Sequence, residues 1–237
     1  MSVPDRSPHD LWVYDLGTVG YREALALQEQ VRARRQADEA PDSVLLLEHS
    51  PVYTLGRRAQ PGELPLGPEQ LRERGIDVHE SDRGGRVTYH GPGQLVAYPI
   101  FAVTDVLAYV RSLEDAIVTA LSRAGLAAHG RADDGPDYTG VWVAERKIAS
   151  IGVHVQRGVT THGLAVNVSN DLEPFSWITP CGLQGVTMTS LQRELGADAP
   201  AIAGFRALLL DGLCEVFERR AVSAPSGDTS PARAVAA

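Results

Sequence analysis

Two residues of this chain, Lys147 and Cys181, have types and surroundings that can support covalent chemistry. The chain has 22 lysines and arginines, and Lys147 is the only lysine among them. Arginine cannot replace lysine where an amine has to lose its proton. Cys181 lies between a proline and a glycine, in irregular backbone that can present amide groups to a reacting carbonyl. Because a nearby ammonium favours the thiolate, the two residues together indicate an activated nucleophile.

Both residues also have an ordinary structural interpretation. A strong bias towards arginine still leaves an occasional lysine, and a lone cysteine is most often a small buried hydrophobe. Cys214 stands beside Leu213 in a helical pattern, so we predict that it only contributes to packing. His162 and His90 compete with Lys147 as the proton acceptor, and either of them can instead be a structural histidine.

The densest group of unusual residues is the segment 82–94, DRGGRVTYHGPGQ. Its glycines permit positive φ angles and let a ligand approach the backbone closely, although two ordinary turns around a strand would explain them as well. A strand-like run follows Gly93, which excludes the phosphate loop of a Rossmann fold. No Walker A glycines precede Lys147, so a phosphate loop of that type is excluded too.

The composition is that of a globular domain with its own core. The chain has 237 residues, a net charge of −8 and 43% hydrophobic residues. Two cysteines and seven scattered histidines offer neither a disulfide framework nor metal-ligand spacing, so we expect no metal. The acidic balance argues against nucleic-acid binding. Without an apolar run of about 20 residues or a signal-peptide pattern, the chain is expected to be cytoplasmic.

Hydrophobic spacing predicts the elements that must position these residues. Helices are expected over Tyr21–Arg35, from Val106 onward with Asp105 as N-cap, and from Ile202 onward. Strand-like runs cover residues 11–16, 44–47, 86–89, 94–100, 141–143, 148–155 and 163–168. Short connections among the later runs favour antiparallel pairing. The pattern predicts one mixed α/β (α+β) sheet domain over residues 11–220, with residues 1–10 and 221–237 as disordered tails.

Four blocks of the sequence, in order, resemble the signature of the lipoyl(octanoyl) transferase family. They are residues 83–94 (RGGRVTYHGPGQ), 146–153 (RKIASIGV), 162–167 (HGLAVN) and 180–182 (PCG). Any one block is weak, but four in order are highly specific. The resemblance implies a biotin/lipoate protein ligase-like fold, a mixed sheet flanked by helices and related to the catalytic core of class II aminoacyl-tRNA synthetases.

The resemblance also implies an acyltransferase that needs no cofactor. Such an enzyme takes an octanoyl group from octanoyl-acyl carrier protein and transfers it to a specific lysine of lipoyl domains. The acceptors belong to 2-oxoacid dehydrogenase complexes and to the glycine cleavage H protein. By position, Cys181 matches the acyl-thioester nucleophile and Lys147 the residue that lowers its pKa. The residues expected to line the acyl substrate are Arg83, Gly84, Gly85, Arg86, Val87, Thr88, Tyr89, His90, Ser150, Ile151, Gly152, Gly163, Leu164 and Ala165.

Several alternatives stay open at this point. His162 and Asn167 are candidates for a supporting role. An ATP-dependent lipoate ligase has the same fold but uses no enzyme thioester. A non-catalytic carrier-protein or lipid-binding module would leave Cys181 incidental, and a cysteine hydrolase would use His162 as its base. An acidic carrier protein also requires a basic docking patch, for which Arg57, Arg58 and Arg146 are candidates.

Overall fold

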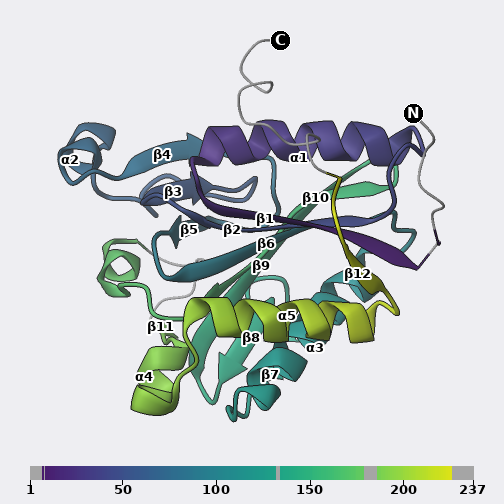
Figure 1. The fold of residues 1–237 in the computed structure, drawn as a ribbon. Helices are drawn as coiled ribbons and strands as arrows, with labels where there is room; N and C mark the ends of the chain where they lie inside the picture. The colour runs from purple at the N-terminus through teal and green to yellow at the C-terminus, as the bar shows by residue number, and fades with distance from the viewer. Residues whose placement is uncertain (1–6, 8, 132–133, 179–185, 226–237) are drawn as a thin grey trace.

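The computed structural model describes residue 7 and residues 9–131, 134–178 and 186–225. Within this part of the chain, a large mixed sheet lies between helix α1 (Tyr21–Gln36) on one face and helices α3 (Val106–Arg123) and α5 (Ile202–Val216) on the other (Figure 1). A second, three-stranded sheet lies beside α1 and the large sheet. This arrangement confirms the predicted α+β class and the three main helices.

The described residues form nine strands in the large sheet, with β11 paired to β9 beside the main path. In spatial order the strands on that path are β12 (Arg220–Ser223), β1 (Asp10–Val19), β2 (Ser43–His49), β6 (Gln94–Ile100), β10 (Val159–Asn167), β9 (Arg146–Gln156), β8 (Gly140–Val143) and β7 (His129–Gly130). The small sheet has the order β4 (Asp77–Glu80), β3 (Val52–Leu55) and β5 (Val87–His90). The remaining elements are β11 (Thr187–Met188), α2 (Pro68–Glu73), α4 (Leu191–Leu195) and the 3-10 turns Glu173–Trp177 and Gly196–Asp198.

Antiparallel pairing joins β2, β6, β10, β9 and β8, as the short connections predict. Between β9 and β10 the chain turns through Arg157 and Gly158, whose φ angles are 49° and 76°. A two-residue loop with both φ angles positive matches the right-handed twist of a hairpin. This tight turn fixes the register in which Ala165 faces Ser150 and Gly163 faces Gly152.

Helix α3 supplies much of the core on its side of the sheet. Asp105 caps it as predicted, because its Oδ1 accepts hydrogen bonds from the amides of Leu107 (2.9 Å) and Ala108 (3.0 Å). The first turn of the helix lies outside the core, and Leu107 is 73% exposed. Cys214 of α5 is partly buried and packs against the same core, as predicted. The residues of α3 that are buried in this core are Tyr109, Leu113, Ala116, Ile117, Ala120 and Leu121.

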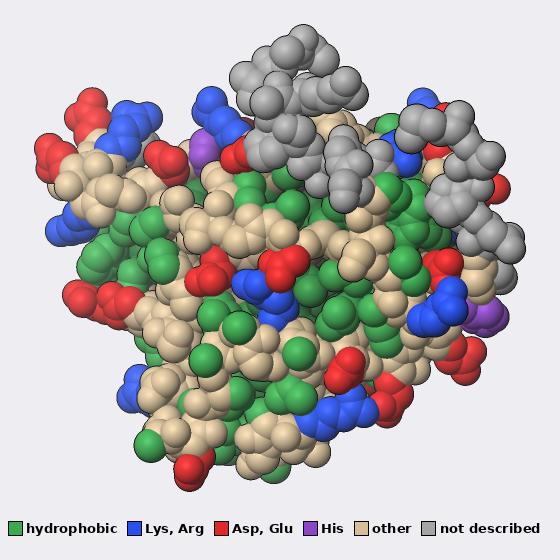
Figure 2. All heavy atoms as spheres, viewed as in Figure 1, with side chains coloured by type: hydrophobic (Ala, Val, Ile, Leu, Met, Phe, Trp, Pro, Cys, Tyr) green, Lys and Arg blue, Asp and Glu red, His purple; other side chains and the backbone are tan. Residues whose placement is uncertain are grey.

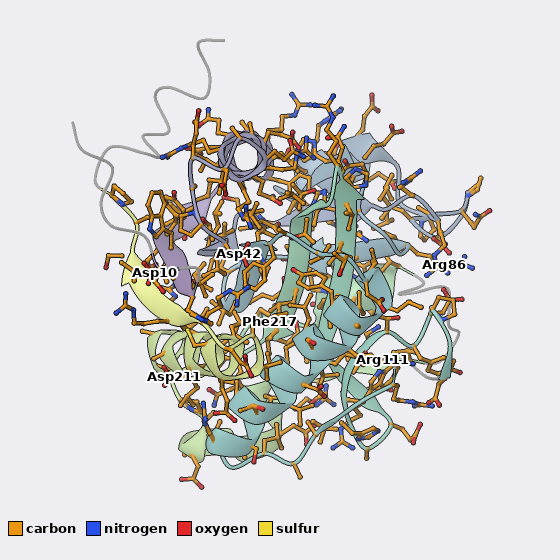
Figure 3. The ribbon with its side chains drawn as sticks, turned by 90° about the vertical axis from the view of Figure 1, so that its right-hand side faces the viewer. Asp10, Asp42, Arg86, Arg111, Asp211 and Phe217 are labelled. Atoms are coloured by element: carbon orange, nitrogen blue, oxygen red, sulfur yellow. The ribbon has the colours of Figure 1, made fainter. Side chains whose placement is uncertain are left out.

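The expectation of disordered tails over 1–10 and 221–237 is wrong for Asp10, which begins β1, and for residues 221–223, which belong to β12. This strand pairs in parallel with β1, and the amide of Arg220 donates to the carbonyl of His9 (2.7 Å). The Ala/Ser/Pro-rich composition of this segment does not indicate a strand. The short edge strand is stabilised by its hydrogen bonds to β1. Figure 3 shows Asp10 and Asp42, which pair with Arg220 and Arg219, on the side of the molecule away from Arg86.

Within the described ranges, no helix has both the length and the apolar character required to span a bilayer.

Candidate active site

A pocket lies where strand β5 and the loop before it meet β9 and β10 of the large sheet. It contains about 610 Å³ of empty space, part of which is open to solvent. The segment 136–139 forms a further wall, and Val87, Ile151, Leu164 and Ala165 give the lining an apolar component. Its lining residues are Tyr21, Arg58, Arg83, Gly85, Arg86, Val87, Thr88, His90, Tyr98, Pro136, Asp137, Thr139, Lys147, Ser150, Ile151, Gly152, His162, Gly163, Leu164 and Ala165.

Lys147 reaches this pocket from β9, and its side chain is almost completely buried. Its Nζ donates a hydrogen bond to the carbonyl of Thr139 (2.9 Å) and lies 5.3 Å from the ring centroid of Trp142. Trp142 is the partner of Lys147 across β8 and β9, at a point where the register of the two strands shifts. An ammonium over an indole face is attracted by the ring quadrupole. Strand pairing therefore places Trp142 beside the Lys147 amine, and Thr139 directly precedes β8.

Gly140 makes room for the Lys147 side chain. A Cβ atom at Gly140 would lie 2.8 Å from Cε of Lys147 and 2.4 Å from the carbonyl oxygen of Ala149. Its φ of 134° also lies in the region that only glycine adopts easily. A larger residue at this position would displace the lysine.

The glycine-rich loop is held in shape by Arg83, whose side chain is buried. The guanidinium donates to the carbonyl and hydroxyl of Thr54 and to the carbonyls of Gly84 and Arg86, at distances between 2.6 and 3.1 Å. These hydrogen bonds from the guanidinium hold the loop of residues 83–86 in its conformation. The loop also lies in close contact with β9, because a Cβ atom at Gly152 would lie 2.8 Å from the Gly84 carbonyl oxygen.

Two histidines near the pocket are buried and neutral. His49 contacts the Val19 carbonyl through Nδ1 (2.8 Å) and the Tyr98 hydroxyl through Nε2 (2.7 Å). Burial lowers its pKa to about 4, and the bond to Val19 opposes this only in part. Burial also lowers the pKa of His90 to about 3, and its Nδ1 lies 2.7 Å from Oε1 of Gln94. Neither ring carries a positive charge at neutral pH.

His162 sits in strained backbone at the same pocket, with a φ of 58°. The side chain of Gln28 holds it there, because Oε1 accepts from the His162 amide at 2.6 Å. Nε2 of His162 lies 2.6 Å from Oδ1 of Asp82, and this contact is the largest cause that lowers the pKa of Asp82 to about 2. His162 is thus fixed both by its backbone and by its ring.

Asn167, the last residue of β10, is buried and does not line the pocket. Its Oδ1 accepts from the side chain of Gln94 (2.9 Å), and its Nδ2 donates to the carbonyl of Thr189 (2.9 Å). The amide of Thr189 in turn donates to the carbonyl of Lys147 (2.9 Å). Asn167 therefore connects Gln94 of β6, whose side chain also contacts His90, to Thr189, which binds the strand of Lys147.

Most of the predicted site residues lie together, but two expected lining residues do not line this pocket. The ring of Tyr89 packs in the core of the small sheet, 5.3 Å from the ring of Tyr53. The amide of Gly84 donates to the carbonyl of Val153 (2.9 Å), so this glycine fastens the loop to β9. Cys181, with Pro180 and Gly182, lies outside the described residues.

The sequence reasoning missed the wall formed by Pro136, Asp137 and Thr139, as well as Tyr21 and Tyr98. The run Gly135-Pro136-Asp137 just before β8 is a turn signal that pointed to an ordered loop near Lys147. Nothing in the sequence separates the two tyrosines from ordinary core aromatics.

Of the candidate docking arginines, Arg57 is exposed, and the other two are ion-paired. Arg58 pairs with Asp137 (3.0 Å), and Arg146 pairs with Glu194 (2.8 Å).

Comparison with known proteins identifies the family. A model described as the lipoyl protein ligase A/B catalytic domain matches residues 20–214. The octanoyltransferase of Chloroflexus aggregans is 45% identical over 91% of this chain and 99% of its own length. That of Rubrobacter xylanophilus is 47% identical over 85% of this chain and 90% of its own. That of Myxococcus xanthus is 42% identical over 90% of this chain, which spans 61% of its length.

Solved structures agree on the fold. The protein Ta0514 of T. acidophilum, a putative lipoate protein ligase with bound lipoic acid, superposes with a TM-score of 0.76 at 21% identity, over 94% of this chain and 93% of that one. A lipoate-protein ligase A bound with ATP gives a TM-score of 0.77 at 19% identity, over 94% and 93% of the two chains. The biotin protein ligase of Aquifex aeolicus gives 0.51 at 12% identity, over 89% and 70%. With the sequence relatives, these findings show that the chain belongs to the octanoyltransferase family, carries its lipoyl protein ligase A/B catalytic domain, and is an acyltransferase.

Proposed function

We propose that this chain transfers an octanoyl group from octanoyl-acyl carrier protein to a lysine of lipoyl domains, through a thioester on Cys181. The observation that supports this most strongly is the buried amine of Lys147 in a partly apolar pocket, held by the Thr139 carbonyl. The amide of Thr189, which follows β11, donates to the carbonyl of Lys147. The chain that follows residues 179–185 thus runs directly beside Lys147.

In the first half-reaction, the Cys181 thiolate attacks the carbonyl of the carrier thioester. The bond between the acyl carbon and the carrier sulfur breaks, and the Lys147 ammonium gives a proton to the departing thiolate. The products are an octanoyl thioester on Cys181, the free carrier thiol and a neutral Lys147 amine. Exchange of one thioester for another is nearly isoenergetic, so no nucleotide is consumed.

In the second half-reaction, the neutral amine of the acceptor lysine attacks the enzyme thioester. An amide bond forms, the bond to the Cys181 sulfur breaks, and Lys147 takes the proton that the amine loses. The enzyme returns to a thiolate and an ammonium. One buried amine can therefore serve as acid in the first step and as base in the second.

The apolar lining supports an acyl substrate. Val87, Ile151 and Leu164 come from three different strands and line one pocket. Each methylene that leaves water contributes about 0.8 kcal/mol, so a medium-length chain binds firmly in such a pocket. Gly163 keeps the wall close to the neighbouring strand, because a Cβ atom there would lie 2.4 Å from the carbonyl oxygen of Ala97.

The protein partners of the reaction are also part of the proposal. An acidic carrier protein would favour a basic surface. On the face drawn in Figure 2, acidic and basic side chains are interspersed. Arg57 is exposed and adjoins Arg58 of the pocket, which makes this region our candidate for the carrier.

The test is the intact mass of the protein after it is mixed with octanoyl-acyl carrier protein in buffer without ATP and magnesium. We expect one octanoyl adduct, located by peptide mapping on Cys181, that disappears when a lipoyl domain is added. Cys214→Ser is the matched control and should keep the adduct, because Cys214 packs in the core. An adduct on Cys214 would contradict the proposal, and activity only with ATP and free octanoate would indicate a ligase.

A further inference from the structure

Glu114 on helix α3 is a buried carboxylate that does not line the pocket. Its Oε1 accepts a hydrogen bond from the amide of Gly140 at 2.7 Å. Its other carboxylate oxygen faces Gly130, where a Cβ atom would lie 2.6 Å away. Glycines at two strand ends thus let this side chain reach the backbone of β7 and β8.

The amide of Gly140 and the carbonyl of Thr139 belong to the same peptide group. A peptide group is planar, and in its trans form the N–H and the C=O point in opposite directions. Glu114 binds the N–H side of this group, and Nζ of Lys147 binds the C=O side at 2.9 Å. One rigid unit therefore separates the carboxylate of Glu114 from the ammonium of Lys147.

We propose that Glu114 is a positioning residue for Lys147, which it holds through the peptide group between Thr139 and Gly140. By fixing the amide, Glu114 fixes the direction of the carbonyl that the ammonium contacts. A carboxylate on the N–H side also polarises the peptide group and makes its carbonyl a better acceptor, as in other hydrogen-bond chains. The glycine-specific backbone of Gly140 allows this orientation.

The catalytic consequence rests on the proposed function of Lys147. An amine that exchanges a proton with a substrate must keep its direction towards the reacting atoms through both half-reactions. Trp142 contacts the ammonium from the side, and the Thr139 carbonyl gives it a directional hydrogen bond. A misplacement of about 1 Å can cost about 100-fold in rate.

The experiment uses the fact that Lys147 is the only lysine of the chain. Protein labelled with lysine that carries ¹³C at Cε gives one side-chain signal, which reports the surroundings of this amine directly. Glu114→Asp withdraws the carboxylate, and Glu114→Gln keeps an acceptor oxygen without the charge. Asp115→Ala is the matched control, since Asp115 is the exposed neighbour on the same helix.

We expect Glu114→Asp to shift the Lys147 signal and to slow decay of the acyl-enzyme by roughly 10- to 100-fold. Glu114→Gln should restore most of the wild-type signal position and most of the wild-type decay rate. Asp115→Ala should change neither the signal nor the decay rate. An unchanged Lys147 signal in Glu114→Asp would overturn the inference, as would a shifted signal with a normal decay rate. If Lys147→Ala were fully active, the proposed function of Lys147 would be wrong. The Lys147 signal in the Glu114 variants would still show whether Glu114 positions the amine.

A second measurement does not depend on the folding of Glu114 variants. Lys147→Met leaves Glu114 in place but removes the donor to the Thr139 carbonyl. Because both bonds share one peptide group, we expect the ¹⁵N and ¹H signals of the Gly140 amide to shift. An unmoved Gly140 signal would contradict the coupling.

Discussion

At Lys147, a substitution can distinguish between a fixed positive charge and a group that exchanges protons. A guanidinium keeps its charge in proteins and does not deprotonate. We therefore predict that Lys147→Arg still forms some acyl-enzyme but transfers the acyl group about 10²–10⁴-fold more slowly. The measurement has two stages: adduct formation by mass, then decay of the adduct after a lipoyl domain is added.

The control for this variant is Lys147→Ala, which should be defective in both stages because it lacks the charge as well. Wild-type decay in the arginine variant would leave Lys147 as a fixed charge. The guanidinium is larger than the ammonium, and the space beside the lysine is tight, because a Cβ atom at Gly140 would lie 2.8 Å from Cε of Lys147. A crystal structure of the variant has to show the Thr139 and Gly140 backbone in place before the rates are compared.

Between strands, the glycines set how closely the pocket walls approach one another. A Cβ atom at Gly163 of β10 would lie 2.4 Å from the Ala97 carbonyl oxygen and 2.6 Å from Cδ of Pro99. We predict that Gly163→Ala lowers the free energy of unfolding by roughly 1–3 kcal/mol, because backbone atoms of β6 must move. Urea denaturation measures this change.

Gly204→Ala is the matched control, since it makes the same substitution in a helix. The nearest atom to a Cβ there is Cβ of Pro200, at 3.7 Å. Alanine loses less conformational entropy in a helix, so Gly204→Ala should raise the free energy of unfolding by about 0.5–1 kcal/mol. Equal effects of the two substitutions would show that the close approach at Gly163 is not what matters.

The edge strand β12 ties the C-terminal part of the chain to β1. Arg219 pairs with the buried carboxylate of Asp42 (2.9 Å), and Arg220 pairs with Asp10 (2.7 Å). A chain that ends at Glu218 loses these pairs and exposes the edge of β1. We predict that its free energy of unfolding falls by on the order of 3 kcal/mol, since a buried carboxylate loses one of its partners.

A chain that ends at Pro225 keeps β12 and these ion pairs, and it serves as the control. It should melt at the same temperature as the full chain in differential scanning calorimetry. If the chain ending at Glu218 also melted at the temperature of the full chain, β12 would contribute nothing to stability.

Over the whole molecule, the sequence predicted what depends on local pattern. The helices after Gly20 and Asp105 follow from hydrophobic spacing, with a side-chain cap at Asp105, and the antiparallel strands around Lys147 follow from their short connections. Strand β12 was missed because its stability comes from partners far away in the chain, such as His9. The peptide group that links Glu114 to Lys147 was missed for the same reason. Which glycines face a pocket and which fasten a loop, as Gly84 does, is decided only by tertiary packing.

The buried histidines make the stability of the whole molecule depend on pH. Burial lowers the pKa of His49 to about 4 and that of His90 to about 3. In the unfolded chain a histidine titrates near 6.5, so below this pH the unfolded state binds protons that the folded state does not. Stability must therefore rise with pH between about 4 and 6.5, with each histidine contributing up to about 1.4 kcal/mol per pH unit.

Asp82 titrates outside this window. Its pKa of about 2 lies below that of an ordinary aspartate, so the stability that it contributes is lost only as the pH falls below about 4. Urea denaturation at pH 5.0, 6.0 and 7.5 should thus report the histidines. We expect His49→Gln to flatten the dependence, whatever its effect at pH 7.5, because one of the histidines with a lowered pKa is gone. His129→Gln, at an exposed position, should leave the slope unchanged. A slope in His49→Gln equal to that of the wild type would mean that His49 takes up its proton without unfolding.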